Sequence, residues 1–415
     1  MSTQAAPASR SEILVERVLA AMPVIDGHND LPTALRATAG YRVEGLDGHR
    51  PELHTDIPRL RAGGVGGQFW SVYVPSHLPE PEAVVATLEQ IDAVYRLVAA
   101  YPDVFAVAYT AGDVRRAIRG GRIASLIGVE GGHSIAGSLG VLRTLARLGV
   151  RYLTLTHNDN TAWADSATDD PSAGGLSDTG RTVVAELNRL GVLVDLSHVA
   201  ASTQRDALDV SVAPVIFSHS GVRAVNDHPR NVADAELRRL RTNGGVLQLT
   251  FVPAFVSPAV AEWTEEAAAE RRRHGLPAIP WTWPRAPRPG EDAAALAAEQ
   301  ARARALAGSP DERFARWLVA HPRPEVSIGE VVAHVEHARE VVGVEHLGLG
   351  GDYDGVDRQP AALGEVSGYP RLLHELAERG WSAAELEALT GRNVLRVLRD
   401  AEDVAETPLW PEVAV

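Results

Sequence analysis

The sequence contains no cysteine in its 415 residues. This absence excludes disulfide bonds, thiolate metal ligands and a cysteine nucleophile. Any metal ion would therefore bind to histidine, aspartate or glutamate. Positive charge is also scarce, because 40 Lys and Arg residues face 54 Asp and Glu residues, and the formal net charge at pH 7 is −14. Since such a surface repels phosphate backbones and anionic lipids, we expect neither nucleic acid nor a membrane as a partner.

Long apolar runs are missing as well. No stretch reaches the roughly 18 to 20 apolar residues that a membrane-spanning helix needs. Glu12, Glu16 and Arg17 interrupt the apolar residues near the N-terminus, which is not typical of a secretion signal, and the C-terminal residues lack the hydrophobic tail of a lipid-anchor signal. Ser9 with Glu12 three residues later fits a capping box, so residues 1–22 are predicted to carry an N-terminal helix. We expect a soluble, cytoplasmic protein.

The sequence also lacks a P-loop, a dinucleotide-binding glycine fingerprint and a serine nucleophile elbow. It has instead eight short apolar runs that alternate with helix-like segments, at residues 23–30, 67–75, 123–130, 152–157, 192–198, 214–219, 245–252 and 346–352. Runs this apolar, each followed by a helix, indicate a parallel sheet covered by helices. Eight strands close a (β/α)8 TIM-type barrel, which we expect to span residues 23–400.

Two regions fall outside this repeat. Residues 255–325 form a long insertion after the seventh predicted strand, with a proline-rich part at 277–289. Because active sites lie at the face where this insertion would emerge, it is either a functional lid with helices of its own or surface elaboration. The tail at 401–415 is short and acidic, and we expect it to pack on the outside.

A pair of metal-ligand residues ends the first predicted strand. His28 and Asp30 are two residues apart, so on an extended backbone both side chains point to the same face. Burying an imidazole and a carboxylate together is costly unless something compensates for it. A metal ion would compensate, and the pair therefore indicates chelation.

The other predicted strands end in similar residues. Taken alone, a single histidine is more often a surface residue or a hydrogen-bonded core residue, and a single aspartate after a strand often caps a helix. Taken together, five strand ends offer six nitrogen or oxygen ligands, which are His28, Asp30, Glu130, His198, His219 and Asp352. This set suffices for two divalent ions with one bridging carboxylate. One ion would leave too many buried charged groups unpaired.

Six motifs in order resemble the renal (membrane) dipeptidase family, which are zinc hydrolases of the amidohydrolase group of metal-dependent barrels. The motifs are DGHNDLP at 26–32, GVEGGHS at 128–134, LTLTHN at 153–158, DLSH at 195–198, FSHS at 217–220 and GGDYDG at 350–355. The resemblance extends from about residue 24 to about residue 393, nearly the whole chain. Unlike the mammalian members, this sequence has no cysteine, secretion signal or anchor signal, so their extracellular setting is not implied.

The resemblance implies a binuclear zinc site and a set of roles. One ion would bind to His28, Asp30 and Asp352, the other to His198 and His219, and Glu130 would bridge the two. His157 would contact the substrate carbonyl or the oxyanion, and Arg230 would bind the terminal carboxylate of the substrate. Taken alone, Arg230 would be read as part of a surface salt bridge, but guanidinium groups suit carboxylates geometrically. Because family members commonly pair, the resemblance also implies a homodimer.

The implied function is zinc-dependent hydrolysis of dipeptides, including those with a D-residue at the C-terminal side. Two divalent ions that share a water lower its pKa to about 7, which gives a bridging hydroxide that attacks the peptide carbonyl. Asp352 would take the proton of this water and hand it to the leaving amine. Two alternatives stay open: an N-acyl-amino-acid deacylase or lactonase on the same metal site, and a non-catalytic metal-binding scaffold. The ligands do not discriminate between the hydrolases, whereas His157 and Arg230 argue against the scaffold.

Overall fold

The structure is a computed structural model that describes residues 9–276 and 311–406. Within these residues nine strands form one parallel sheet in the order β2-β1-β9-β8-β7-β6-β5-β4-β3. Strand β2 also pairs with β4, so eight strands close into a barrel and β3 stays outside it. The strands are β1 (Val24–Asn29), β2 (Val65–Tyr73), β3 (Phe105–Val107), β4 (Ile123–Glu130), β5 (Val150–Thr154), β6 (Leu193–Asp195), β7 (Ile216–Ser220), β8 (Val246–Leu249) and β9 (Leu347–Leu349). The predicted (β/α)8 barrel is confirmed.

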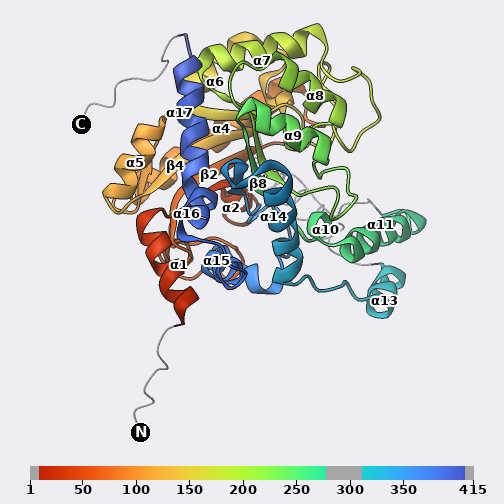
Figure 1. Ribbon diagram of the computed structural model, residues 1–415. Helices are drawn as coiled ribbons and strands as arrows, with labels where there is room; N and C mark the ends of the chain where they lie inside the picture. The colour runs from red at the N-terminus through yellow and green to blue at the C-terminus, as the bar shows by residue number, and fades with distance from the viewer. Residues whose placement is uncertain (1–8, 277–310, 407–415) are drawn as a thin grey trace.

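Helices enclose the barrel on the outside (Figure 1). The helices that precede the seventh barrel strand are α1 (Arg10–Ala21), α2 (Leu31–Ala39), α3 (Ile57–Ala62), α4 (Glu80–Ala100), α5 (Ala111–Arg119), α6 (Leu139–Arg147), α7 (Asp178–Leu190), α8 (Ala201–Val210) and α9 (Asp234–Asn243). Those that follow it are α10 (Pro253–Val256), α11 (Pro258–Arg273), α13 (Glu312–Ala320), α14 (Ile328–Val342), α15 (Tyr369–Glu378), α16 (Ala383–Glu387) and α17 (Asn393–Val404). Side chains between the strands and the helices form the main apolar core.

The short strand β3 has no counterpart among the eight predicted runs. It pairs with residues 123–125 at the start of β4, whereas β5 pairs with the end of β4. Three residues are too few to produce a recognisable hydrophobic period, which is why the sequence pattern does not reveal this strand. Because β3 lies outside the ring, the barrel still has eight strands.

Three side chains predicted at strand ends lie beyond the strands. The prediction that β5, β6 and β9 end in His157, His198 and Asp352 was wrong, because each of these residues follows its strand by three positions. His198 has φ 70° and Asp352 has φ 56°, a left-handed backbone conformation that a strand does not contain. Such a conformation costs on the order of 1 kcal/mol or more and is concentrated at functional sites in proteins.

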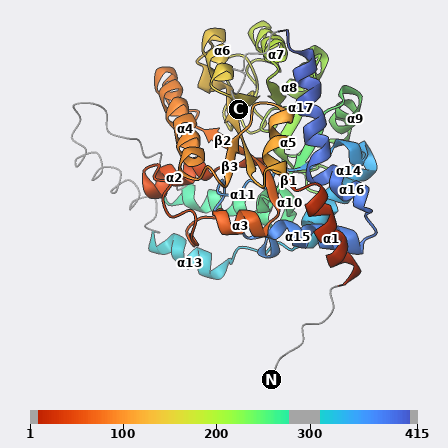
Figure 2. The ribbon, with the colours of Figure 1, turned by 90° about the vertical axis from the view of Figure 1, so that its left-hand side faces the viewer.

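The amino ends of the strands are closed by apolar packing. Ile25, Leu193, Ile216 and Val246 lie near the starts of their strands and form one apolar cluster with residues of α5 and α17. These two helices contact each other and lie side by side (Figure 2). Polar chemistry is therefore left to the carboxyl ends of the strands, where the active sites of such barrels are found.

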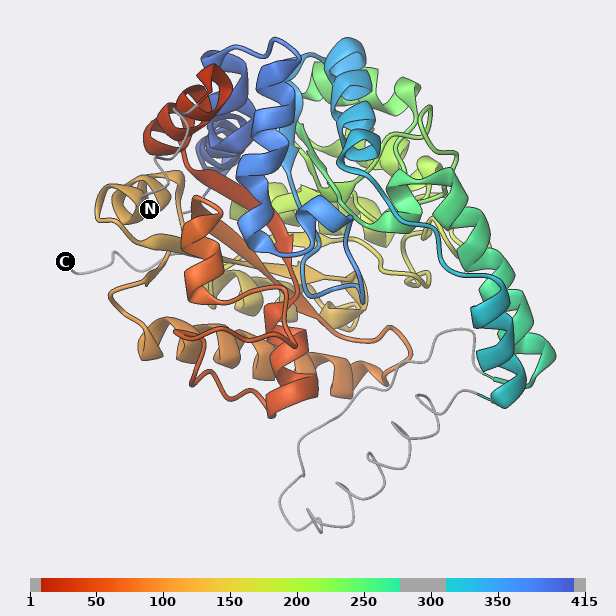
Figure 3. The ribbon, with the colours of Figure 1, turned by 90° about the horizontal axis from the view of Figure 1, so that it is seen from below.

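The insertion after β8 has helices of its own in its described part. It begins with α10 and α11 and returns through α13, and the latter two helices lie side by side away from the barrel (Figure 3). The indole N–H of Trp263 donates to the backbone oxygen of His321 at 2.8 Å, and its ring lies 6.1 Å from that of Trp317. The proline-rich part at 277–289 lies outside the described residues, so the choice between lid and surface elaboration stays open.

The first and last described helices, α1 and α17, lie on the outside of the barrel. Helix α1 begins after Ser9, whose hydroxyl oxygen accepts from the backbone N–H of Glu12, and the reciprocal bond completes the predicted capping box. Helix α17 continues to Val404, past the predicted boundary at residue 400, and residues 407–415 lie outside the described part. In the described ranges no helix combines the length and the apolarity that crossing a bilayer requires.

Candidate metal centre

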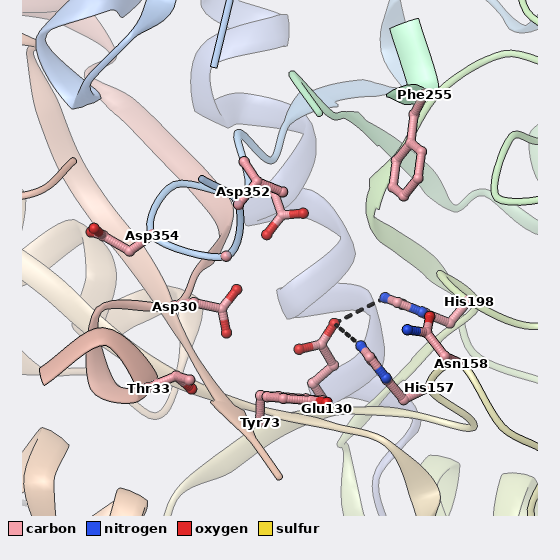
Figure 4. A pocket seen from close by; sticks show the side chains of 12 residues that line it. Asp30, Thr33, Tyr73, Glu130, His157, Asn158, His198, Phe255, Asp352 and Asp354 are labelled. Atoms are coloured by element: carbon pink, nitrogen blue, oxygen red, sulfur yellow. Dashed lines mark ion pairs between the residues drawn. The ribbon is translucent and has the colours of Figure 1, made fainter. Parts of the chain in front are cut away.

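Glu130, the last residue of β4, lies close to four imidazoles, and two of them, His157 and His198, are drawn beside it in Figure 4. Its Oε1 lies 3.0 Å from His198 Nε2 and 3.4 Å from His219 Nε2, and its Oε2 lies 3.5 Å from His28 Nε2. These rings come from the loop after β6, from β7 and from β1. Barrel closure therefore brings together residues that are up to 191 positions apart, since 219 − 28 = 191.

Asp30 and Asp352 form an acidic pair beside His28. Asp30 Oδ2 lies 3.3 Å from His28 Nε2, and one ligand atom from each of the three residues lies within 4.8 Å of the others. Burial raises the pKa of Asp352 well above its usual value; His28 opposes this rise, whereas the negative charges of Asp30 and Glu130 add to it. Two buried carboxylates this close repel each other unless a proton or a cation lies between them.

The backbone of Gly355 passes directly over the acidic pair. A Cβ at this position would lie 2.1 Å from Asp352 Oδ1 and 2.4 Å from Asp30 Oδ2. Any side chain would therefore displace at least one of the two carboxylates. The loop after β9 is closely fitted to these oxygens, and glycine is the residue that permits this approach.

His157 faces the same carboxylate from the loop after β5. Its Nε2 lies 3.8 Å from Glu130 Oε1, and its ring packs between those of Tyr73 at 4.4 Å and His198 at 4.2 Å. Burial lowers the pKa of His157 to about 3, and the neighbouring Arg230 contributes to the shift. A neutral imidazole at this place can donate one hydrogen bond or bind a metal ion. The geometry therefore permits a ligand role for His157 as well as the predicted contact with substrate.

The polar atoms of this cluster suit a cation. His28 Nε2 and Asp30 Oδ1 are buried and have no hydrogen-bond partner among the described residues. Buried polar atoms in proteins are almost always paired, so two unpaired ones in one cluster indicate a missing partner. Imidazole nitrogens and carboxylate oxygens are ligands for zinc and similar divalent ions. The residues present therefore fit the metal ions that the sequence analysis predicts.

Arg230 lies behind the imidazoles, in the loop after β7. Only 3% of this residue is exposed, and its Nη2 donates to the backbone oxygen of His219 at 3.4 Å. Its Nε and Nη1 have no hydrogen-bond partner within the described ranges. Burial lowers the pKa of Arg230 to about 10, although Glu130 and Asp352 oppose the shift. A guanidinium with two unused N–H groups can bind a carboxylate in a bidentate manner.

Phe255, which follows β8, covers this arginine. Its ring centre lies 5.0 Å from the guanidinium carbon of Arg230. Two buried side-chain amides fix it there, because Asn226 Nδ2 and Asn231 Nδ2 both donate to the backbone oxygen of Phe255, at 3.0 and 2.7 Å. No motif in the sequence indicates a role for Phe255, Asn226 or Asn231. These contacts join two separate loops and leave no local pattern.

Two buried carboxylates that the sequence analysis leaves without a role hold the backbone around the cluster. Asp26 accepts hydrogen bonds from the backbone N–H of His28 and Gly351 and from the side chains of Gln68 and Tyr369. Asp195, which lies behind His219, likewise accepts hydrogen bonds from backbone N–H groups and from side-chain hydroxyls. A charged residue inside an apolar run is the signal that could have found both, since a buried charge without partners is costly.

A cavity of about 300 Å³ opens over the cluster. Its lining combines acidic, histidine and aromatic side chains, and the residues that Figure 4 labels are Asp30, Thr33, Tyr73, Glu130, His157, Asn158, His198, Phe255, Asp352 and Asp354. The volume is that of a small-molecule site. All eight predicted site residues lie in or directly behind this cavity, since His28, His219 and Arg230 contact the lining residues.

Comparison with known proteins identifies the class of this barrel. The family model described as membrane dipeptidase (peptidase family M19) matches residues 14–412. An uncharacterised dipeptidase of Schizosaccharomyces pombe is 40% identical over 404 residues, which cover 94% of this chain and 83% of that protein. The crystal structure of the probable dipeptidase PvdM from Pseudomonas aeruginosa has a TM-score of 0.78 and 24% identity, and the match covers 95% of this chain and 99% of PvdM.

A second crystal structure holds a dipeptide mimic. A metallopeptidase from Rhodobacter sphaeroides, liganded with a phosphinate mimic of the dipeptide L-Ala-D-Ala, has a TM-score of 0.71 and 23% identity, and the match covers 92% of this chain and 99% of that one. The fold and these comparisons define a peptide-bond hydrolase on a (β/α)8 barrel, in a family of metallopeptidases that use divalent metal. The chain belongs to the membrane dipeptidase family, peptidase family M19.

Proposed function

We propose that this hydrolase is a dipeptidase that binds two zinc ions. His28, Asp30 and Asp352 would hold one ion, His198 and His219 the other, and Glu130 would bridge them. The observation that carries the proposal is one buried cluster, in which His28, His198 and His219 lie against Glu130, and Asp30 and Asp352 lie beside His28. Two polar atoms of this cluster, His28 Nε2 and Asp30 Oδ1, lack a hydrogen-bond partner among the described residues. The membership in a metallopeptidase family supports the use of divalent metal. Zinc is the member of this ion class that the family resemblance favours.

The metal ions would supply Lewis acidity, which lowers the pKa of a water and polarises a carbonyl oxygen. The chain itself supplies the proton transfer and the orientation of the substrate. Asp352 accepts a proton from the attacking water at a carboxylate oxygen and returns it to the leaving nitrogen. His157 is neutral and donates to the carbonyl oxygen as negative charge develops there.

Arg230 would bind the C-terminal carboxylate of the substrate. The two unused N–H groups of its guanidinium match the two oxygens of a carboxylate. A peptide whose carboxylate lies one residue beyond the scissile bond would be held with its carbonyl over the metal ligands. A contact of this kind would favour dipeptides, because a longer peptide carries its carboxylate farther from the scissile bond.

Dipeptides with a D-residue at the C-terminal side are included in the proposal. The Rhodobacter sphaeroides metallopeptidase, which has the same fold, is liganded with a mimic of L-Ala-D-Ala. This likeness supports testing both configurations of the C-terminal residue. The homodimer that the family resemblance implies stays a prediction.

The test combines metal analysis with a substrate panel. The protein is stripped with a chelator, reloaded with Zn²⁺ and analysed for bound metal. The panel contains L-Ala-L-Ala, L-Ala-D-Ala, L-alanyl-L-alaninamide, N-acetyl-L-alanine and a simple lactone. Two zinc ions per chain and hydrolysis of the free dipeptides, with little hydrolysis of the amide, are expected. Glu130→Gln should bind less zinc, whereas Glu16→Gln, at an exposed position of α1, should bind as much as the wild type.

The other outcomes separate the alternatives. Hydrolysis of N-acetyl-L-alanine or the lactone without hydrolysis of any dipeptide would replace the proposal with the deacylase or lactonase. A fully loaded protein that is inert toward the whole panel would favour the non-catalytic scaffold.

A further inference from the structure

A chain of hydrogen bonds extends behind His219, on the side away from Glu130. His219 Nδ1 lies 2.8 Å from the hydroxyl oxygen of Ser218, and that hydroxyl donates to Asp195 Oδ2 at 2.6 Å. All three residues are at most 1% exposed. On the opposite side of the ring, His219 Nε2 lies 3.4 Å from Glu130 Oε1. The ring therefore connects a buried carboxylate to the metal centre.

The partners of Asp195 fix the direction of these bonds. Its Oδ1 accepts from the backbone N–H of Ser197 and of Ser218, at 3.1 and 2.8 Å. Its Oδ2 accepts from the hydroxyls of Thr154 and Ser218, at 2.5 and 2.6 Å. Four donors thus converge on one carboxylate, which as an ionised group can only accept. The single proton of the Ser218 hydroxyl is committed to Asp195, so the hydroxyl oxygen can only accept from His219.

We propose that Asp195, acting through Ser218, fixes His219 in the tautomer with the proton on Nδ1. The lone pair of the ring then lies on Nε2 and points toward Glu130. This inference rests on the proposed function, in which Nε2 of His219 is a metal ligand. Asp195 and Ser218 are positioning residues in this arrangement, because they act through the imidazole and touch neither substrate nor metal. Groups that hold the second nitrogen of a histidine ligand in this way fix its tautomer and orientation.

The other two ligand histidines are held differently. His198 Nδ1 is buried without a hydrogen-bond partner in the described part of the chain. His28 Nδ1 lies 2.9 Å from the hydroxyl of Tyr152, which can donate or accept, so this contact does not select a tautomer. Of the three ligand histidines, His219 is therefore the one whose Nδ1 faces a group that fixes its proton. Its Nε2 lies 3.0 Å from His198 Nε2, which can donate to it in the metal-free protein.

Asp195→Asn is the sharpest test, because it changes a hydrogen-bond direction and keeps the shape. The amide oxygen must stay at the Oδ1 position, since the two backbone N–H groups of Ser197 and Ser218 need an acceptor. The amide NH₂ then faces the hydroxyls and donates to them. The Ser218 hydroxyl is freed to donate to His219 Nδ1, which moves the ring proton to Nε2. Ser218→Ala, the second variant, removes the connection and should leave a mixture of tautomers.

The readout is the ¹⁵N NMR spectrum of the metal-free protein labelled at histidine, in which protonated and unprotonated ring nitrogens are well separated. His219→Gln identifies the signal. The wild type should show Nδ1 protonated, Asp195→Asn should show Nε2 protonated, and both variants should bind one of two zinc ions about 10- to 100-fold more weakly. Ser125→Ala is the matched control, because the Ser125 hydroxyl is also buried in a barrel strand and has no hydrogen-bond partner in the described ranges.

Two results would overturn the inference: a wild-type ring protonated on Nε2, or an Asp195→Asn spectrum identical to that of the wild type. A failure of the proposed function looks different. In that case the wild-type ring is protonated on Nδ1 and responds to Asp195→Asn, but the protein binds no divalent ion at any of the proposed ligands.

Discussion

The ring of Phe255 lies 5.0 Å from the guanidinium carbon of Arg230, and Phe255 lines the cavity while Arg230 lies buried behind it. An aromatic face orients a guanidinium and shields it from water, at about 0.5–2 kcal/mol. Phe255→Leu keeps the apolar cover but removes this face. We expect KM for dipeptides to rise about 3- to 10-fold with kcat nearly unchanged, measured by steady-state kinetics. Phe314→Leu is the matched control, since Phe314 packs under Arg271 in the insertion.

Arg230→Lys tests the carboxylate contact itself. Lysine keeps the positive charge but loses the planar fork, so a bidentate contact becomes a single one. We expect KM for L-Ala-L-Ala to rise about 10- to 100-fold, consistent with the roughly 1.5–3 kcal/mol of a hydrogen bond to a charged group. The rate with L-alanyl-L-alaninamide, which has no carboxylate, should change little. Equal losses for both substrates would mean that Arg230 acts on the fold of the loop rather than on the substrate.

Gly355→Ala tests the fit of the loop over the acidic pair. The added Cβ would lie 2.1 Å from Asp352 Oδ1, so the carboxylate must move. We expect zinc to bind about 10-fold more weakly or worse at one of two sites, measured by competition with a chelating dye, while the melting temperature of the metal-free protein changes little. Gly48→Ala is the control, because a Cβ there would have its nearest neighbour at 3.7 Å. If Gly355→Ala bound zinc as tightly as the wild type, Asp352 and Asp30 would not be ligands of the proposed site.

The barrel could be predicted from the sequence because its eight strands are apolar and buried on both faces. Strand β3 could not, since Phe105–Val107 is too short for a period. The candidate ligands were found because they follow or end these apolar runs. Their convergence into one cluster around Glu130 and His28 requires ring closure, which the motifs imply but do not demonstrate.

Contacts between loops leave no signal in the local sequence. Asn226 and Asn231 donate to the backbone of Phe255, and nothing in their local sequence indicates that partner. The left-handed backbone at His198 and Asp352 could not be predicted from the sequence either, because aspartate and histidine follow strands in many ordinary turns. Buried charge is the exception: Asp26 and Asp195 stand inside apolar runs and could have been identified as hydrogen-bonded core residues.

Asp352→Asn separates the two proposed roles of the Asp352 carboxylate, which are metal binding and proton transfer. An amide has nearly the same shape, but it cannot accept and return a proton at neutral pH. We expect kcat to fall about 10²- to 10⁴-fold with KM nearly unchanged, the range typical of general acid–base groups. Zinc content measured on the same samples distinguishes loss of proton transfer from loss of a ligand. Asp357→Asn, at an exposed position of the same loop, should retain wild-type activity and metal content.

His334 should make the fold sensitive to acid. It is buried in α14, where its Nδ1 accepts from the backbone N–H of Val222 and its Nε2 donates to the backbone oxygen of Val256. Burial lowers its pKa from 6.5 to about 4. Between these two pH values the unfolded chain binds a proton at this residue and the native protein does not. Stability is therefore lost as the pH falls through this window, by up to about 3 kcal/mol at about 1.4 kcal/mol per pH unit.

The measurement is urea unfolding of the metal-free protein at several pH values from 7 to 4. In His334→Gln the free energy of unfolding should fall less steeply with decreasing pH than in the wild type, even if the variant is less stable at pH 7. The exposed residue His77 provides the control, since His77→Gln should follow the wild-type curve. Parallel curves for His334→Gln and the wild type would mean that His334 binds its proton in the native state, and that the two backbone contacts do not keep it neutral.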